Sequence, residues 1–327
     1  MNSFGNNFRL NIFGESHGPA VGIVIDGCLP GIPISMDEFS ADLNRRKGGV
    51  LDGTTQRAEP DIPECISGIF NGYTTGTPIT LQFRNSDVKS EDYTQRDIPR
   101  PGHADFIAGV KFKGYQDYRG GGHFSGRLTV CLVAAGVIAK KMLKRLAPDL
   151  ECNAFIKEAG GETDVEAAVQ KAIETNDSIG GIVECICKNV PSGLGEPFFN
   201  SVESVLSHAL FSIPAIKGVE FGSGFAAAQM KGSVHNDVLI SEEGKTKTNN
   251  AGGVTGGLSN GNELLFRVCV KPASSTPKEQ ESLNLTSGNI EKFTVKGRHD
   301  LAIVLRVPVV VEAVACCVLT DMFLSGK

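Results

Sequence analysis

The chain of 327 residues contains no tryptophan, only four tyrosines and no excess of positive charge. Its formal net charge is −5 and its isoelectric point is near 5.8. Nucleic acids and anionic membranes attract basic surfaces, so this balance argues against broad binding to either. No apolar run is suited to span a bilayer, because residues 130–139 are too few and residues 301–324 are interrupted by charged residues and a proline.

The N-terminal residues MNSFGNN lack a basic segment followed by an apolar one, so we expect no export signal and a cytoplasmic protein. The nine cysteines lie mostly in apolar runs, which is typical of reduced thiols packed in the core of a cytosolic protein. Neither Cys185-x-Cys187 nor Cys316-Cys317 has zinc-site spacing. The sequence therefore predicts reduced cysteines and no metal centre.

Glycine is abundant instead, with 39 residues, and three are consecutive in the segment DYRGGGHFSGR at 117–127. Without Cβ atoms this backbone can bend sharply and approach a ligand closely. Two guanidinium groups, an imidazole and a hydroxyl flank the glycines. Such groups, together with free backbone N–H donors, suit phosphate or carboxylate. We interpret residues 117–127 as an anion-binding loop.

Strands and helices alternate irregularly along the chain, which favours a mixed α+β fold over a doubly wound α/β fold. Strands are expected at 20–26, 179–188 and 264–270. Helices are expected to open at the capping boxes Ser35-x-x-Glu38 and Thr163-x-x-Glu166, over 129–146, and from Pro308. No linker-like segment divides the chain, and polar glycine motifs are spread from residue 14 to residue 300. We therefore expect one domain covering residues 1–327.

Two histidine motifs and one aspartate motif carry candidate proton-transfer groups. His17 lies between glycines in GESHG, where it suits proton transfer near neutral pH or serves as a polar turn residue. His103 lies in RPGHAD, two residues before Asp105. As a pair these residues could bind a metal, but no third ligand has convincing spacing, so a metal site is the minor alternative. Asp300 in RHD is expected to stay ionised between cations and to accept a proton, unless the motif is a surface ion cluster.

Three further segments offer cations or glycines for a ligand. Residues 45–49, RRKGG, end a predicted helix and with Arg57 form a candidate anion clamp, although a solvated helix end is the alternative. Residues 249–261 are too rich in glycine for a helix or central strand, which favours a backbone that wraps a ligand over a flexible loop. Residues 271–276, KPASST, suit a phosphate or form a strand-exit turn.

Two standard nucleotide motifs match only in part. Residues 121–126 have Walker-A glycine spacing, but Arg127-Leu128 replaces the Lys-Ser/Thr that holds phosphate and magnesium. Residues 222–227, GSGFAA, resemble a dinucleotide fingerprint without the surrounding βαβ pattern. Both interpretations are rejected.

The order of the motifs is more specific than any one of them. GESHG, RPGHAD, DYRGGG, KGVEFG, GGVTGGLSNG, KPASS and GRHD follow one another along the chain. Together they closely resemble the chorismate synthase family over essentially the full length. Members of that family are carbon–oxygen lyases of aromatic amino acid biosynthesis. They convert 5-enolpyruvylshikimate 3-phosphate to chorismate by 1,4-anti elimination of phosphate, which is the last common step of the shikimate pathway. The reaction requires reduced FMN, although it has no net redox change.

The resemblance implies roles for individual residues. His17 is expected to protonate or hydrogen-bond the departing phosphate, His103 to stabilise the reduced flavin, and Asp300 to take a proton at flavin N5. The substrate-binding residues implied are Arg46, Arg57, Arg119 and Arg127. The FMN-binding residues implied are His123, Phe124, Ser125, Ala215, Gly256, Lys271, Pro272, Ala273, Ser274, Ser275 and Arg298.

The resemblance also implies a fold and partners. Family members place a helical layer between two antiparallel β-sheets and assemble as homotetramers. Some reduce FMN themselves with NADPH, whereas others depend on a separate flavin reductase. This chain is compact and has no obvious added segment, so we expect it to depend on an external reductase.

The chain departs from the common family pattern at several positions. Residues 123–129, HFSGRLT, replace RSSARET, and His123 stands where an arginine is usual. Asp52, Pro214 and Leu301 replace an arginine, an asparagine and a proline. None of these changes affects the mapped histidines or Asp300, so we expect activity to survive.

Two other functions compete with this reading. A non-catalytic flavin- or phosphate-binding protein would keep the glycine loops, but it would need neither the two histidines nor Asp300. A metal-dependent hydrolase would use His103, Asp105 and His123. Activity that is lost with a chelator such as EDTA and does not depend on flavin would identify the hydrolase rather than the lyase.

Overall fold

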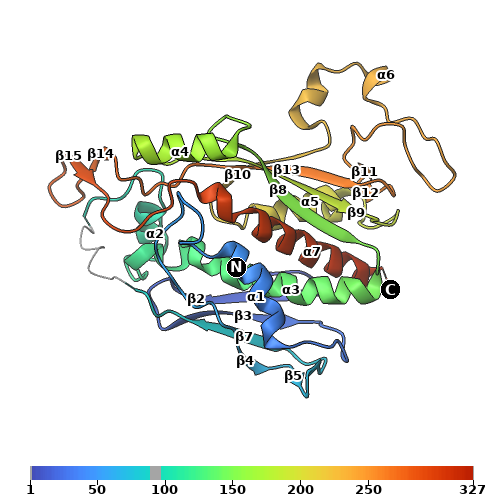
Figure 1. Cartoon of the computed structure of the whole chain (residues 1–327), viewed down its shortest axis with the longest axis horizontal. Coiled ribbons are helices and arrows are strands. Elements are labelled where there is room, and N and C mark those ends of the chain that lie inside the picture. The colour runs from blue at the N-terminus through green and yellow to red at the C-terminus, as the bar shows by residue number, and fades with distance from the viewer. Residues whose placement is uncertain (1, 89–96, 327) are drawn as a thin grey trace.

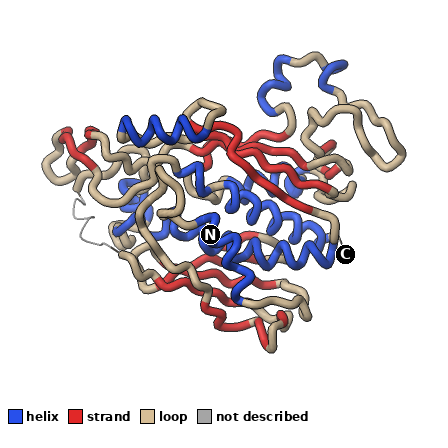
Figure 2. Tube along the Cα trace, in the orientation of Figure 1, coloured by secondary structure: helices blue, strands red, loops and turns tan. Residues whose placement is uncertain are grey.

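The computed structural model describes residues 2–88 and 97–326 and has two antiparallel sheets with helices between them (Figures 1 and 2). The first sheet has the strand order β1 (Ser3–Phe4), β2 (Arg9–Gly14), β3 (Ala20–Asp26), β7 (Ile79–Arg84), β4 (Glu64–Ser67). The second has the order β10 (Ile216–Phe221), β13 (Leu264–Val270), β9 (Gly181–Lys188), β8 (Glu151–Ala159). This layered α+β architecture confirms the expected fold class.

Helices and short hairpins complete the chain. The α-helices are α1 (Ser40–Arg46), α2 (Asp105–Lys111), α3 (Thr129–Leu146), α4 (Val165–Thr175), α5 (Val202–Leu210), α6 (Gly232–His235) and α7 (Pro308–Ser325). The 3₁₀ turns are η1 (Met36–Phe39), η3 (Arg119–Phe124), η4 (Gly126–Leu128), η5 (Phe198–Asn200), η6 (Gly224–Gln229) and η7 (Ile303–Arg306). The hairpins are β5 (Ile69–Phe70) with β6 (Tyr73–Thr74), β11 (Val254–Thr255) with β12 (Leu258–Ser259), and β14 (Glu279–Leu283) with β15 (Ile290–Thr294).

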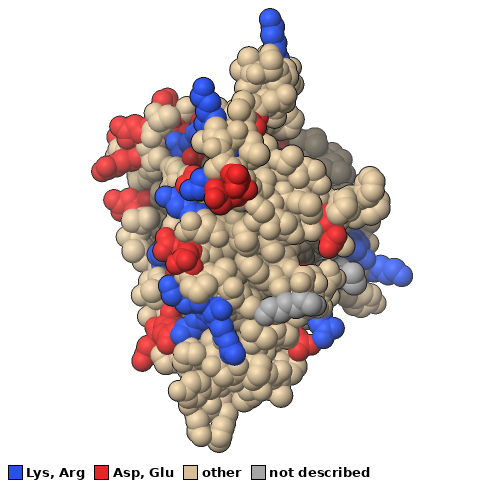
Figure 3. All heavy atoms as spheres, turned by 90° about the vertical axis from the view of Figure 1, so that its right-hand side faces the viewer, with Lys and Arg blue, Asp and Glu red and all other residues tan. Residues whose placement is uncertain are grey.

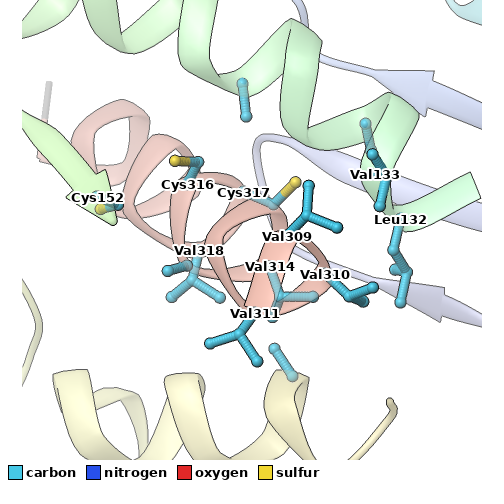
Figure 4. Close-up of a cluster of buried hydrophobic side chains, with 14 of the residues drawn as sticks. Leu132, Val133, Cys152, Val309, Val310, Val311, Val314, Cys316, Cys317 and Val318 are labelled. Carbon is cyan, nitrogen blue, oxygen red and sulfur yellow. The ribbon is translucent and has the colours of Figure 1, made fainter. Parts of the chain in front are cut away.

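Helices α3 and α7 form the centre of the molecule. Residues 129–139 of α3 and nearly all of α7 are apolar or small, and the two helices pack against each other between the sheets (Figure 1). The close approach requires Gly136, because a Cβ there would lie 2.3 Å from the Cβ of Ala313. Valines of α7 meet side chains of α3 on one flank, and Cys152 of β8 lies near the same helix (Figure 4). The hydrophobic core is continuous from one sheet to the other.

Among the described residues α7 is also the helix long and apolar enough to cross a membrane. However, 78% of that segment is buried inside the protein, which is the position of a core helix. The charged residues of α7 are used internally. Glu312 binds Arg45 through two 2.7 Å hydrogen bonds, and Asp321 accepts hydrogen bonds from the backbone N–H groups of residues 6–8.

Local patterns predicted several elements well. The strands at 20–26 and 264–270 and the helix at 129–146 have the expected bounds, and α7 begins at Pro308. The second capping box is wrong: the carboxylate of Asp164, rather than the hydroxyl of Thr163, accepts the hydrogen bond of the Ala167 N–H at 3.0 Å. Ser35 precedes η1 and makes no side-chain capping bond.

The prediction that the cysteines are reduced is wrong for one pair. Cys152 and Cys187 are joined in a disulfide. They lie directly opposite each other on β8 and β9, a register that brings residues 35 positions apart in the sequence into contact. The other seven cysteines, all within the described residues, are unpaired. Spacing along the chain did not reveal this pairing, because it depends on how two strands align.

Candidate active site

A cavity of about 390 Å³ lies where loops from all parts of the chain meet. In the N-terminal half of the chain, the wall is formed by the loops that follow β2 and α1, the turn at 100–104, and η3 and η4. In the C-terminal half, it is formed by the loop before β10, the loop after β13, and residues 298–310. Its volume falls in the range of roughly 300–1,000 Å³ usual for small-molecule sites. A neighbouring cavity of about 500 Å³ shares Arg100, His103, Ala104 and Phe124 with it.

The charge of the smaller cavity differs from that of the protein. Among the described residues its wall holds eight lysine and arginine side chains against three carboxylates, whereas the whole chain has a net charge of −5. At the end of the molecule shown in Figure 3, by contrast, acidic and basic side chains are interspersed. The cations are therefore concentrated around this cavity, and a ligand with several negative charges fits its wall best.

The three consecutive glycines bring the two candidate histidines together. Gly120, Gly121 and Gly122 all have positive φ, a region that side chains disfavour. A Cβ on Gly120 would lie 2.4 Å from Cδ2 of His17, and one on Gly121 would lie 3.2 Å from Nε2 of His103. Both imidazoles therefore lie against one short stretch of backbone, which only glycine permits.

A methyl group at position 120 tests this contact without removing any chemical group. In Gly120→Ala the new Cβ pushes the His17 ring out of place, and we expect kcat to fall about 10- to 100-fold, the scale of a small misplacement of reacting groups. Gly72→Ala is the matched control, because Gly72 also has positive φ (78°) but a Cβ there meets nothing within 4 Å. Steady-state kinetics should show a fall in kcat for Gly120→Ala and not for Gly72→Ala. An equal fall in kcat for both variants would mean that backbone strain, rather than displacement of His17, is responsible.

His17 is buried behind the wall rather than on it. His17 is 8% exposed, and the neighbouring Ser16 and Gly120 line the cavity in its place. Burial lowers the pKa of His17, and the charges of Arg57 and Arg119 lower it further. The imidazole is consequently neutral at pH 7 in the free protein.

Arg57 connects this region to the wall. Its Nη1 donates to Ser16 Oγ at 2.8 Å and its Nη2 to the Ser16 carbonyl at 2.9 Å. Glu59 holds the other edge of the guanidinium, accepting from Nε at 3.0 Å and from Nη2 at 2.7 Å. Glu59 in turn accepts from the N–H and hydroxyl of Ser86 at 2.8 and 2.9 Å. The arginine is thus fixed in place before any ligand arrives.

His103 lies on the wall and is oriented by Asp105. The His103 Nδ1 is 2.6 Å from Asp105 Oδ1, and Arg100 binds the same carboxylate through two 2.7 Å hydrogen bonds. Burial opposes ionisation of Asp105, but Arg100 and His103 outweigh it and hold its pKa far below the usual range. An ionised Asp105 only accepts, so Nδ1 carries the proton and Nε2 is left for the ligand.

Asp300 and Arg298 lie on the wall with separate partners. Asp300 accepts from the Thr55 N–H at 2.9 Å and from Arg306 Nη1 at 2.9 Å. Arg298 binds Asp87 through hydrogen bonds of 2.6 and 2.9 Å, and this pairing lowers the Asp87 pKa to about 2. Arg298 and Asp300 therefore both bind charged groups outside the RHD motif.

The remaining residues implied by the resemblance divide into two groups. Those on the wall are Arg46, Arg127, Phe124, Ser125, Ala215, Lys271, Ala273, Ser274 and Ser275. Those outside it are Arg119, His123, Pro272 and Gly256. Arg119 binds Asp117 at 2.8 Å, and the Nδ1 of His123 lies 2.8 Å from the Gly14 carbonyl. Gly256 lies in the β11–β12 hairpin, at the opposite end of the molecule from α2 (Figure 1).

Sequence reasoning missed several residues of the wall. Arg100, Arg306, Glu59 and Asp61 all line the cavity and bind its other charged groups. Arg306 carried a usable signal, since a single cation in an otherwise apolar run from 301 to 311 needs a buried partner or a ligand. Arg100 lay within the RPGHAD motif and was assigned no role.

The comparisons with known proteins agree with one another. A family model described as chorismate synthase matches residues 8–324. The chorismate synthase of Chitinophaga pinensis is 60% identical over 325 residues, covering 99% of this chain and 97% of that protein. The chorismate synthase of Korarchaeum cryptofilum is 43% identical over 348 residues, covering 97% and 96%. A solved structure titled "Crystal Structure of Chorismate Synthase" superposes with a TM-score of 0.75 at 25% identity, covering 98% of this chain and 93% of that one.

Proposed function

The chain belongs to the chorismate synthase family of carbon–oxygen lyases, and we propose that its cationic cavity holds 5-enolpyruvylshikimate 3-phosphate next to reduced FMN. The reaction is the 1,4-anti elimination of phosphate that yields chorismate, the last common step of the shikimate pathway. The observation that supports the assignment of the cavity is its charge, eight cations against three carboxylates among the described residues. The substrate carries two carboxylates and a phosphate, and the flavin carries a second phosphate.

The donors of the wall fit both ligands. Lys271 Nζ donates to Ser274 Oγ at 2.6 Å, and Arg100 Nη1 donates to Ser275 Oγ at 3.0 Å. These four groups make a compact set suited to the flavin phosphate. Arg46, Arg57 and Arg127 line the same cavity and suit the substrate anions. Ile303, Val307 and Val310 add an apolar stretch of wall that helps to exclude water.

The residues of the chain divide the remaining work. When bound, reduced flavin supplies an electron transiently to assist C–O cleavage and recovers it with the substrate hydrogen. His103, with its Nδ1 held by Asp105, presents Nε2 as a hydrogen-bonding group toward the flavin. Asp300, which accepts hydrogen bonds from the Thr55 N–H and from Arg306, is the proton acceptor. Ser16 and Arg57 receive the departing phosphate, and His17 lies directly behind them as the proton source.

Assembly and cofactor supply extend this proposal. We expect a homotetramer, which the exposed apolar side chains Phe198, Phe199 and Phe225 support, since they are 86%, 92% and 84% exposed in one chain. We also expect a cytoplasmic enzyme that receives reduced FMN from a separate NAD(P)H-dependent reductase. Among residues 2–88 and 97–326 no three His, Cys, Asp or Glu side chains are grouped to hold an ion.

A direct assay tests the proposed function. Purified protein with chemically reduced FMN, kept anaerobic, is expected to release phosphate and chorismate in equal amounts from 5-enolpyruvylshikimate 3-phosphate. EDTA should leave the rate unchanged. In air, with FMN and NADPH as the reducing system, product should form only after a separate flavin reductase is added. Absence of chorismate in the anaerobic assay would refute the lyase assignment.

A further inference from the structure

A buried carboxylate joins two arginines of the cavity wall. Asp61 Oδ2 accepts from Arg46 Nη2 at 2.5 Å, and Asp61 Oδ1 accepts from Arg127 Nη1. The side chain of Asp61 is completely buried, and each arginine side chain is only 3% exposed. Asp61 adopts a left-handed backbone conformation (φ 52°), which side chains rarely occupy. A strained residue with such a buried charge needs a reason to be there.

The two arginines are fixed to different degrees by other groups. Arg127 donates from Nε to Asn85 Oδ1 at 3.0 Å and from Nη2 to the Arg84 carbonyl at 3.3 Å. Within residues 2–88 and 97–326, the Arg46 side chain has only a long 3.5 Å contact with Thr129 Oγ1 besides Asp61. Its Nε is buried without a hydrogen-bond partner among the described residues. Asp61 is therefore the main restraint on Arg46, which has donor capacity left for an anion.

Arg46 and Asp61 are both charged at neutral pH. Burial lowers the pKa of Arg46 to about 10, and Arg306 and Arg127 act in the same direction, while Asp61 opposes them. Burial works against ionisation of Asp61 as well, but the two guanidiniums outweigh it and keep its pKa below the usual value. Without the carboxylate, two desolvated cations would repel each other across the wall.

We propose that Asp61 is a positioning residue that holds the guanidiniums of Arg46 and Arg127 together so that both bind one anionic group of the substrate. This inference rests on the proposed function, in which those arginines contact the substrate. Asp61 itself has both oxygens occupied by the arginines and acts only through them. A planar carboxylate with one guanidinium on each oxygen sets their separation and orientation.

The sign of the effect on anion binding separates this role from simple charge compensation. Removing the charge of Asp61 makes the cavity more positive. If Asp61 only offsets excess positive charge, its loss should make anions bind more tightly. If Asp61 instead sets the geometry of the two arginines, its loss should let them separate and make anions bind more weakly. The two roles therefore predict opposite shifts.

The experiment uses the full-length variant Asp61→Asn, which keeps the shape and removes the charge. We expect its KM for 5-enolpyruvylshikimate 3-phosphate, measured anaerobically with reduced FMN, to rise about 10- to 100-fold with a smaller change in kcat. The dissociation constant for inorganic phosphate should rise as well. An unchanged or lower KM overturns the inference. If the unmodified protein makes no chorismate, the proposed function fails, and the phosphate titration still decides the role of Asp61.

Two further variants guard against a general loss of folding. Asp321→Asn is the matched control, because Asp321 is also a buried aspartate but binds the backbone N–H groups of residues 6–8 and does not line the cavity. It should lower the melting temperature and leave KM unchanged. Asp61→Gly suits the left-handed backbone and leaves space for formate, which should bring KM back down. An Asp61→Gly enzyme whose KM does not respond to formate contradicts the inference.

Discussion

Replacing His103 with alanine is expected to lower kcat by about 100- to 10,000-fold while the protein stays folded, the loss typical of a removed acid–base group. His103 lines both cavities, and Asp105 fixes its ring with the Nδ1 proton directed to the carboxylate. Its Nε2 lies beside Gly121, the close approach that the absence of a Cβ allows. Alanine removes this group without disturbing the Arg100–Asp105 pair, so the fold should tolerate it.

The measurement is single-turnover and steady-state kinetics with chemically reduced FMN. His208→Ala is the control, because His208 lies on the exposed side of α5 and its ring contacts only Phe4 among the aromatic side chains of the described chain. It should keep the full rate. A His103→Ala enzyme within threefold of the unmodified rate would remove His103 from the mechanism.

Replacing His17 with alanine is expected to lower kcat by about 100- to 10,000-fold, as for His103. His17 is neutral in the free protein, because burial, Arg57 and Arg119 lower its pKa. The dianionic phosphate of the substrate has the opposite effect and favours the imidazolium. The ring can therefore take up a proton when the substrate binds and donate that proton to the leaving phosphate.

The pH dependence of kcat, of kcat/KM and of stability should each contain a contribution from His17 that disappears in the alanine variant. The pKa of His17 governs kcat/KM through the free enzyme and kcat through the complex, so the value seen in kcat should lie above the value seen in kcat/KM. Stability should follow the same residue. Since its folded pKa is lowered, the unfolded chain binds the proton more tightly, and the folded state loses stability as pH falls below about 6.5. His17→Ala should show neither effect; two unchanged pH profiles would contradict the role.

Local patterns predicted much of the secondary structure and none of the side-chain pairings at the site. The bounds of β3, β13 and α3 follow from runs of residues within one element, so period and propensity suffice. The partner of Asp300 is different in kind, because Thr55 lies 245 positions away. The Asp164 cap shows that even a local motif can be displaced by a better competing side chain one residue on.

The sequence by itself determined the family, through the order of seven unusual motifs, and with it the reaction. The catalytic roles of His17, His103 and Asp300 stay predictions. It also determined that helices 129–146 and 308 onward are apolar enough to form the core. Only the tertiary structure decided that His17 lies behind the wall while His103 lies on it, and that Asp61 joins two arginines. The reason is physical: composition and spacing act within a few residues of the chain, whereas burial, ion pairing and cavity shape arise between residues that only folding brings together.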